Sequence, residues 1–520
     1  MEIVTKKKRR NKCRHRETKN YVAPLVAVEQ QIMGNQVPVR TAIKLDHLGS
    51  QFIEWQDNAY NTFLYEGTGK YEELLKEKER HCEEVSAVLS CTKHVVCGSY
   101  GCVFDTPYAG PEGERLLLKV AYGSEPVTEV DTELFQEVLV SMLLYGGMVR
   151  GELPPIFNKT FYSLGCSSGG APESCQPPFD KMLGTTIKRY VQRETDHALN
   201  VKLKHHSWDK LSQQILSARA MGADDEEMSS MISAYLVQEE LVYVDKEPWS
   251  SVDEKTRKQM ASVLKESVQR AFEKTKHHAY FLVENVPNSF KGVVNASADA
   301  QIVVVTLAEI LGALFAAHNH YELAHNDLHT SNLRMKRVPH FDLVAVRLFS
   351  TCVIFKHSGW CPIIIDYGLA QVKHKSGRLH ANKSWEATLS VMAQKGPATD
   401  MMRLLHYMRT TSSHPQSMKS SLWTLQWMLQ KLLGASGNSP FSGTSHPITV
   451  NEVTPGQVEE TFLTWLDGLG VKNQSFAYSS AETMIKRYVD AGKNVLDLTW
   501  RSQSAPIDID SSEDEDDVID

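Results

Sequence analysis

The chain has 520 residues, of which 42% are hydrophobic and 23% are charged, and its formal net charge is −7. This length and apolar content are typical of a large globular protein with a substantial core. The nine cysteines are widely spaced and include no Cys-x-x-Cys pair. That pattern argues against a disulfide framework or a zinc site and indicates a reducing compartment.

The net charge conceals two oppositely charged ends. The run Lys6–Arg16 is densely basic, whereas residues 511–517 are acidic. We expect residues 1–20 and 501–520 to be disordered arms. The basic run is typical of a contact with nucleic acid or an import receptor, and equally of a solvated terminus. Because no apolar run follows it, we expect no signal peptide, which favours the cytoplasm, with the nucleus as the alternative.

Residues 21–94 are predicted to form a helical extension. Residues 95–104 then read as a strand, a glycine turn and a second strand. The candidate cradle in this turn consists of Gly98, Ser99, Tyr100, Gly101 and Val103. Its two glycines would let the backbone approach phosphate groups closely. A Gly-Ser-Tyr-Gly stretch also occurs in ordinary hairpin turns, so this segment alone leaves both interpretations open.

A lysine interrupts the apolar strand predicted at residues 116–120. A charge at such a position is costly unless it is paired. We therefore expect Lys119 to contact both phosphate groups and a carboxylate. The helix predicted over residues 129–145 offers two candidates, and Glu137 is preferred over Glu133 because its neighbours form an apolar, core-facing pattern.

Residues from about 150 to 277 begin with a loop rich in glycine and proline and continue with helical segments. Bracing of the neighbouring sheet, partner binding and substrate recognition are all open roles for this region. Residues 279–283 are predicted to form a buried strand. After it, Glu284 and Val286 are expected at a hinge whose backbone contacts adenine.

The most apolar stretch of the chain covers residues 302–317 and contains Glu309. It is too short to cross a bilayer comfortably. We therefore predict no membrane span and a buried helix that leads into the next segment.

That segment, His325-Asn326-Asp327-Leu328-His329-Thr330-Ser331-Asn332, carries the main chemical signal. An apolar strand at residues 362–365 follows and ends in Asp366-Tyr367-Gly368. Phosphoryl transfer needs a carboxylate facing the incoming hydroxyl and oxygen ligands for magnesium. Asp327 fits the first role, while Asn332 and Asp366 fit the second. Each aspartate alone could be a helix cap, but the ordered set predicts a site for Mg²⁺ and ATP.

Taken in order, these residues resemble the protein-kinase superfamily over roughly residues 95–145 and 278–410. The resemblance implies an α+β, two-lobed fold. A small β-rich N-lobe would span residues 95–285 and contain the insertion at about 150–277, and a mostly helical C-lobe would span residues 286–500. It also implies that Lys119 holds the phosphates, Asp327 is catalytic, and Asp366-Tyr367-Gly368 corresponds to the family's Asp-Phe-Gly.

The chain departs from the family pattern at four places. Val96 stands where kinases place the first loop glycine, and no Ala-Pro-Glu follows Asp366. Asn326 replaces the arginine that pairs with a phosphorylated activation loop, so that form of control is not expected. His329 replaces the lysine two residues after the catalytic aspartate, which turns a fixed charge into a titratable group near the γ-phosphate. Asp400 is expected to support the catalytic loop, or else to act as a plain N-cap.

Toward the C-terminus, residues 347–356 suggest an elongated hairpin, and residues 422–433, 458–469 and 481–489 have helical apolar patterns. The tryptophans expected to anchor this core are Trp423, Trp427 and Trp465.

Three functions fit these features. The first is a serine/threonine protein kinase that acts on protein substrates. The second is a small-molecule phosphotransferase, because the spacing of His325, Asp327, His329 and Asn332 also resembles aminoglycoside and choline kinases. The third is a pseudokinase scaffold, although a scaffold has no chemical need to keep Lys119, Asp327, Asn332 and Asp366 together. The loop sequence and long insertions also resemble serine/threonine kinases of large DNA viruses such as iridoviruses and poxviruses. The oligomeric state is left open.

Overall fold

The computed structural model describes residues 43–44, 93–97, 101–110, 114–123, 133–166, 277–296, 300–373, 379–380, 396–411, 416–434, 453–471 and 473–500, with short pieces between residues 201 and 270. Most of the predicted extension 21–94 and both predicted arms, 1–20 and 501–520, lie outside this part of the chain. The described residues have a mixed α+β architecture with seven α-helices and several mainly antiparallel sheets.

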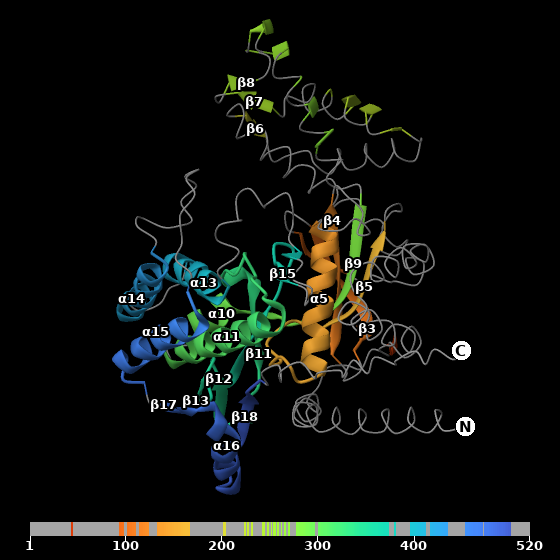
Figure 1. Cartoon of the computed structure of the whole chain (residues 1–520). Coiled ribbons are helices and arrows are strands. Elements are labelled where there is room, and N and C mark those ends of the chain that lie inside the picture. The colour runs from red at the N-terminus through yellow and green to blue at the C-terminus, as the bar shows by residue number, and fades with distance from the viewer. Residues whose placement is uncertain are drawn as a thin grey trace, which may run out of the picture.

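The largest sheet has six strands in the order β1-β3-β4-β9-β5, and β2 pairs with β3. Its strands are β1 (Ile43–Lys44), β2 (Lys93–Cys97), β3 (Gly101–Ala109), β4 (Arg115–Gly123), β5 (Thr160–Cys166) and β9 (His277–Glu284). Only the short β1–β3 pairing is parallel among these. Helix α5 (Glu133–Val149) packs against β4, β5 and β9 and lies alongside the sheet in Figure 1.

Strand β4 shows how the sheet positions a polar side chain. Leu116, Leu118 and Val120 are fully buried, as expected for alternate residues on one face of a strand. Lys119 lies between them in sequence, so its side chain projects from the opposite face. The alternation therefore separates the apolar contacts of β4 from its one lysine.

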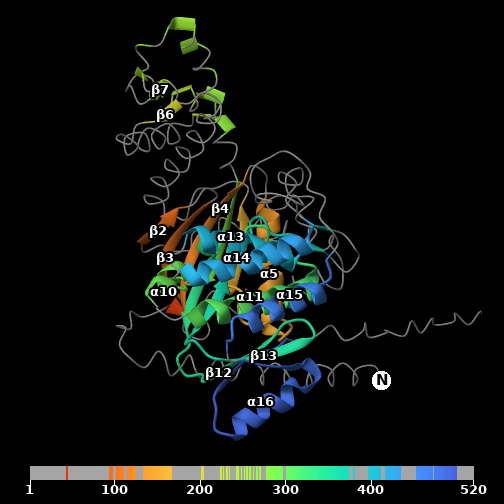
Figure 2. The same cartoon turned by 90° about the vertical axis from the view of Figure 1, so that its left-hand side faces the viewer.

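The helical part of the molecule is built around α11 (Ala300–Tyr321), in which residues 302–317 are all buried. The other helices of this part are α10 (Phe290–Ala296), α13 (Pro397–Thr411), α14 (Gln416–Leu432) and α15 (Pro455–Gly468). Helix α13 contacts α11, α14 and α15, and these helices lie beside the six-stranded sheet in Figure 1 and in front of it in Figure 2. Burial of apolar surface is the main force that holds such a layer together.

Helix α11 also has the length and hydropathy of a membrane-crossing segment over Gln301–Tyr321, the only such helix among the described residues. Most of that segment is buried inside the protein. Core helices and membrane spans share these properties, so the helix does not decide between them.

A small sheet, β10-β11-β14, contacts α11 through β14. Its strands are β10 (Asn288–Ser289), β11 (Leu333–Arg337) and β14 (Trp360–Ile364). Leu333 at the start of β11 pairs with Ile364 at the end of β14. This antiparallel register brings the loop before β11 next to the residues that follow β14.

The hairpin predicted at residues 347–356 exists as β12 (Leu343–Arg347) and β13 (Thr351–Lys356). The structure adds two strands to it, β17 (Asn473–Ala477) and β18 (Val495–Leu498), to give the order β17-β13-β12-β18. Helix α16 (Ala481–Asp490) lies with this sheet at one end of the helical part in Figures 1 and 2.

Two further small sheets are described. One contains β6 (Val201–Leu203), β7 (Val242–Val244) and β8 (Glu247–Pro248), and falls within the predicted insertion. The other pairs β15 (Val372–Lys373) with β16 (Leu379–His380), beyond Asp366.

Two expectations about side chains were wrong. Trp423 and Trp427 are 49% and 42% exposed and stack on each other on α14, with ring centroids 6.4 Å apart, whereas Trp465 is buried as predicted. The two exposed tryptophans are four residues apart, so they share a helix face, and that face points away from the core. Among the cysteines, Cys102 is disulfide-bonded, while Cys352 and Cys361 are free and buried.

Candidate functional site

Helix α13 binds the loop His325–Asn332 through hydrogen bonds. Asp400 accepts hydrogen bonds from the backbone N–H groups of His325, at 2.7 Å, and Asn326, at 2.8 Å. Burial raises the pKa of the Asp400 carboxyl, while the charge of His325 and these two hydrogen bonds act in the opposite direction. The predicted support of the loop by Asp400 is confirmed, and this carboxylate is more than a helix cap.

Asp327 lies at the centre of a polar cluster and keeps 24% of its side chain exposed. One carboxylate oxygen, Oδ1, is 2.8 Å from Nη2 of Arg403 on α13. The other, Oδ2, accepts a hydrogen bond of 3.4 Å from Nδ2 of Asn332, which also donates to the Asp327 backbone carbonyl at 3.0 Å. The carboxylate is therefore oriented from two sides and still partly exposed.

Arg403 is the site residue that sequence reasoning missed. Its Nη1 also donates to the backbone carbonyl of Asn326. The only available signal was its position three residues after Asp400, which places both side chains on one face of α13. That signal acquires meaning only once the helix is known to face the loop.

His329 contacts the cluster from the side. Its Nδ1 accepts a hydrogen bond from the Ser331 N–H at 3.1 Å, and its Nε2 lies 3.6 Å from Asp327 Oδ2. Burial lowers the pKa of His329 below 6.5, and the nearby Arg403 guanidinium acts in the same direction, against the pull of Asp327. At neutral pH the imidazole is therefore mainly uncharged.

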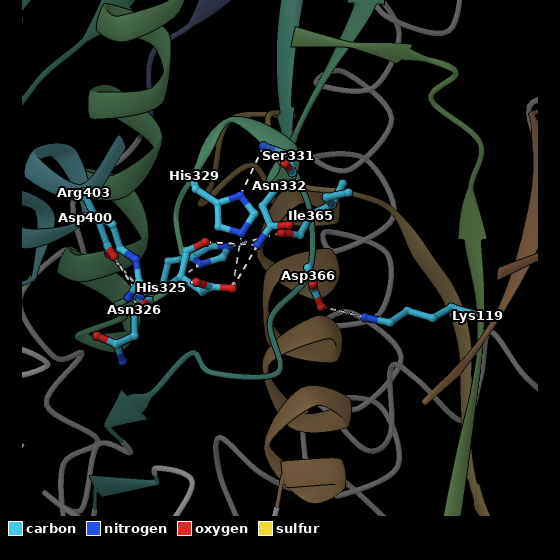
Figure 3. Close-up of polar contacts among 11 residues, drawn as sticks. Lys119, His325, Asn326, His329, Ser331, Asn332, Ile365, Asp366, Asp400 and Arg403 are labelled. Atoms are coloured by element: carbon cyan, nitrogen blue, oxygen red, sulfur yellow. Dashed lines mark hydrogen bonds and ion pairs between the residues drawn. The ribbon is translucent and has the colours of Figure 1, made fainter. Parts of the chain in front are cut away.

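Lys119 and Asp366 connect the six-stranded sheet to this loop region. Nζ of Lys119 forms an ion pair with Glu137 on α5 and lies 2.8 Å from Oδ1 of Asp366. Figure 3 shows the lysine extending from β4 toward the Asp366 carboxylate. The expected pairing of Lys119 with Glu137 is thus confirmed, while its contact with Asp366 was not foreseen. Burial lowers the pKa of Lys119, but the two carboxylates outweigh this effect and raise it overall.

Asp366 combines strain with exposure. It has a φ of +69°, a left-handed conformation that is unusual for a residue other than glycine. Its side chain is nevertheless 47% exposed, and the Lys119 ammonium holds the pKa of the carboxyl below its usual 3.8. Strained residues of this kind concentrate at functional sites.

A set of hydrogen bonds fixes Asp366 relative to the loop. The Ile365 N–H donates to the Asn332 carbonyl at 3.0 Å, and Nε2 of His325 lies 3.2 Å from the Ile365 carbonyl. The Tyr367 hydroxyl donates to the Ile364 carbonyl at 2.7 Å. The residues on both sides of Asp366 are therefore held, and Figure 3 shows Asn332, Ile365 and Asp366 gathered together.

The remaining candidates have mixed outcomes. Gly98, Ser99 and Tyr100 lie outside the described residues. A Cβ at Gly101 would come within 2.2 Å of the Val120 carbonyl, so packing against β4 already requires a glycine there. Val103 pairs directly with Lys119 across β3 and β4.

The predicted hinge follows β9. The Glu284 carboxylate forms a 2.8 Å ion pair with Lys336, so its side chain has a structural partner. Val286 lies two residues after β9 and is buried.

The oxygen atoms that this site could offer to a metal belong to Asp366 and Asn332. No group of three or more His, Cys, Asp or Glu side chains that could hold a metal occurs in the described part of the chain. Magnesium is commonly held by one or two protein oxygens together with substrate phosphates and water. The exposed Asp366 carboxylate fits that mode. Because Asn332 uses its amide N–H groups on Asp327, its carbonyl oxygen is the atom left for a cation.

Comparison of the sequence with models of known protein families and with curated proteins gave no match for this chain.

Proposed function

We propose that the chain is an ATP-dependent serine/threonine protein kinase with the two-lobed arrangement of that superfamily. The observation that carries the proposal is the convergence of four side chains from distant parts of the sequence. Lys119 comes from β4, Asp327 and Asn332 from the loop after α11, and Asp366 from the end of β14. Contacts of 2.8 Å between Lys119 and Asp366 and 3.0 Å between Asn332 and the Asp327 carbonyl link them.

Each side chain has a role that its surroundings support. Lys119, kept charged by Glu137, would bind nucleotide phosphates, which compete with Asp366 for its ammonium group. Asp327 would accept the proton of the acceptor hydroxyl, because it is oriented by Arg403 and Asn332 yet partly exposed. The backbone of Val286 would meet the adenine ring.

Asp366 and the carbonyl oxygen of Asn332 are the residues that would hold magnesium. When bound, the ion neutralises charge on the phosphate oxygens. Because Lys119 contacts Asp366 at 2.8 Å, binding of the metal and nucleotide would require this ion pair to rearrange.

Protein hydroxyls are the proposed acceptors because the glycine turn and the Asp366-Tyr367-Gly368 triplet resemble those of protein kinases. A small-molecule phosphotransferase is the second candidate, and His329 in the place of a lysine favours it. The resemblance to viral kinases, with virion or host proteins as substrates in the infected cytoplasm, belongs to the same proposal.

The proposal is tested with the full-length protein, Mg²⁺ and γ-labelled ATP. One set of reactions contains casein-like proteins and the other contains aminoglycosides or choline. Label in serine or threonine of the proteins supports the kinase. Label in the small molecules alone favours the second candidate. No transfer to any acceptor, together with no Mg²⁺-dependent binding of ATP, would contradict both.

The variant Asp366→Asn gives a separate test of the metal role. We expect Mg²⁺-dependent ATP affinity to fall at least about tenfold, since even outer-shell partners of a metal have effects of that size. Calorimetric titration with and without Mg²⁺ measures it. Asp490→Asn, at the exposed end of α16, is the matched control and should bind as the parent does.

A further inference from the structure

Two side chains of helix α13 contact three consecutive residues of the loop, from His325 to Asp327. Asp400 accepts from the backbone N–H groups of His325 and Asn326. Arg403, three residues further along, donates to the Asn326 carbonyl and pairs with Asp327 at 2.8 Å. Figure 3 shows Asp400 and Arg403 side by side next to His325 and Asn326.

The loop itself contains no lysine or arginine between His325 and Asn332. The basic side chain of His329, within the loop, is 3.6 Å from the Asp327 carboxylate, which is longer than a hydrogen bond. Lys119 is engaged with Glu137 and Asp366. The fixed positive charge in direct contact with Asp327 therefore comes from outside the loop.

We propose that Arg403 is a positioning residue for phosphoryl transfer. From α13, its guanidinium group supplies the fixed charge that orients the Asp327 carboxylate. This inference rests on the proposed function. The loop has no permanently charged cation for this task, because it contains His329 and neither lysine nor arginine. The inference assigns the task to a residue of the helix.

The geometry explains why the residue is an arginine. A guanidinium group carries several donors in a rigid plane, so Nη1 can bind the Asn326 carbonyl while Nη2 binds Asp327. A lysine has one compact ammonium group on a flexible stem and would hold two acceptors less rigidly.

The backbone between these contacts gives Arg403 a second task. Asn326 has a φ of +60°, in the left-handed region. Asp400 binds its N–H and Arg403 binds its carbonyl, so the strained residue is fixed on both sides by one helix. Loss of Arg403 would release the peptide that leads directly into Asp327.

The test compares kcat and KM for ATP in Arg403→Gln, Arg403→Lys and the parent. We expect Arg403→Gln to lower kcat about 100-fold, the size of effect that follows from misplacing a reacting group by about 1 Å. KM for ATP should stay within about threefold, because an interaction made in the transition state lowers kcat and kcat/KM together. Arg403→Lys should recover part of the rate.

The decisive variant adds His329→Lys to Arg403→Gln. A lysine at position 329 would place a fixed charge beside Asp327 from within the loop, and we expect it to recover at least about a tenth of the parent kcat if charge is what was lost. A merely structural role for Arg403 predicts no such rescue. His329→Lys alone should remain active. Arg409→Gln, in the last turn of the same helix, is the control.

Two outcomes overturn the inference while leaving the proposed function intact. One is an active parent and an inactive Asp327→Asn variant combined with an Arg403→Gln variant of unchanged kcat. The other is a slow Arg403→Gln variant that His329→Lys does not rescue at all, although it folds as the parent does by circular dichroism. An inactive parent that binds no Mg²⁺-ATP would instead reject the proposed function.

Discussion

Two polar clusters of this molecule contain the same kinds of side chain but differ in how fully they are paired. The first is the candidate site around Asp327 and Asp366. The second, which we term the turn cluster, consists of Arg347, Glu459, Tyr478 and Trp500 and surrounds the turn between β12 and β13.

In the turn cluster every charge is enclosed. Glu459 is 4% exposed and accepts from the N–H groups of Phe349, Ser350 and Thr351 at 2.8–3.0 Å. The Arg347 guanidinium lies between two aromatic rings, 3.6 Å from the ring centre of Tyr478 and 3.8 Å from that of Trp500. It also donates to the Trp500 carbonyl.

In the candidate site the carboxylates are positioned but left accessible. Asp327 and Asp366 are 24% and 47% exposed, and Asp366 is held in a strained backbone conformation. Glu459, by contrast, is enclosed by backbone N–H donors. The same fold encloses the Glu459 carboxylate completely. The exposure of Asp327 and Asp366 is therefore a property of their positions in the fold, and this protein does not leave every carboxylate exposed.

The largest expected effect tests the accessible cluster. Asp327→Asn should lower turnover by roughly two to four orders of magnitude, the range for a positioned acid-base group, and leave ATP binding nearly unchanged. Steady-state phosphorylation and nucleotide titration measure the two quantities. A variant that phosphorylates as fast as the parent would remove Asp327 from the mechanism.

The turn cluster should respond in stability instead of rate. Glu459→Gln removes a charged acceptor from three backbone N–H groups, and hydrogen bonds to charged groups contribute about 1.5–3 kcal/mol each. We expect the free energy of unfolding to fall by about 2 kcal/mol in urea titrations, with the rate of phosphorylation unchanged for folded protein at low temperature. Glu460→Gln, the exposed neighbour on α15, should change neither. Unchanged stability in Glu459→Gln would show that enclosure does not distinguish the clusters.

The smallest effect depends on pH. His357, buried after β13, accepts from the Gly359 N–H at 3.1 Å, and burial lowers its pKa from 6.5 to about 4. The unfolded chain therefore binds a proton below pH 6.5 that the folded chain does not bind until about pH 4. Stability from this group is complete above pH 6.5 and declines as the pH falls toward 4.

The variant His357→Asn, which keeps an acceptor for Gly359, should lose less stability than the parent over that interval. The difference should be about 1–3 kcal/mol, at about 1.4 kcal/mol for each unit of pKa. Urea titrations at pH 7.5 and pH 4.5 give the comparison. Equal losses in both proteins would show that His357 is not a source of acid sensitivity.

Much of the local structure follows from periodicity. The strands around Lys119 and at residues 279–283, the helix over residues 302–317 and two helices of the C-terminal third occur close to their predicted bounds, and α14 begins six residues before its predicted start at residue 422. Glu137 was separated from Glu133 by the same apolar pattern. These predictions succeed because burial of one face of a strand or helix leaves a regular mark in the sequence.

Other features leave no such mark. Trp423 and Trp427 were expected in the core because large aromatic residues are usually buried, yet no element among the described residues covers their face of α14. Strands β17 and β18 join a hairpin more than 100 residues earlier in the chain, a pairing that no local pattern encodes.

The sequence by itself determined which side chains are candidates: the ordered set Lys119, Asp327, Asn332 and Asp366 could be named from spacing and residue chemistry. Only the tertiary structure decided that Arg403 contacts Asp327, and that Lys119 contacts Asp366 in addition to the predicted Glu137. The physical reason is that residue type and periodicity are local properties of the chain. A charge pair, by contrast, depends on the packing of elements far apart in sequence. Here α13 packs against the loop and brings Arg403 to Asp327, and β4 lies near the end of β14 and brings Lys119 to Asp366.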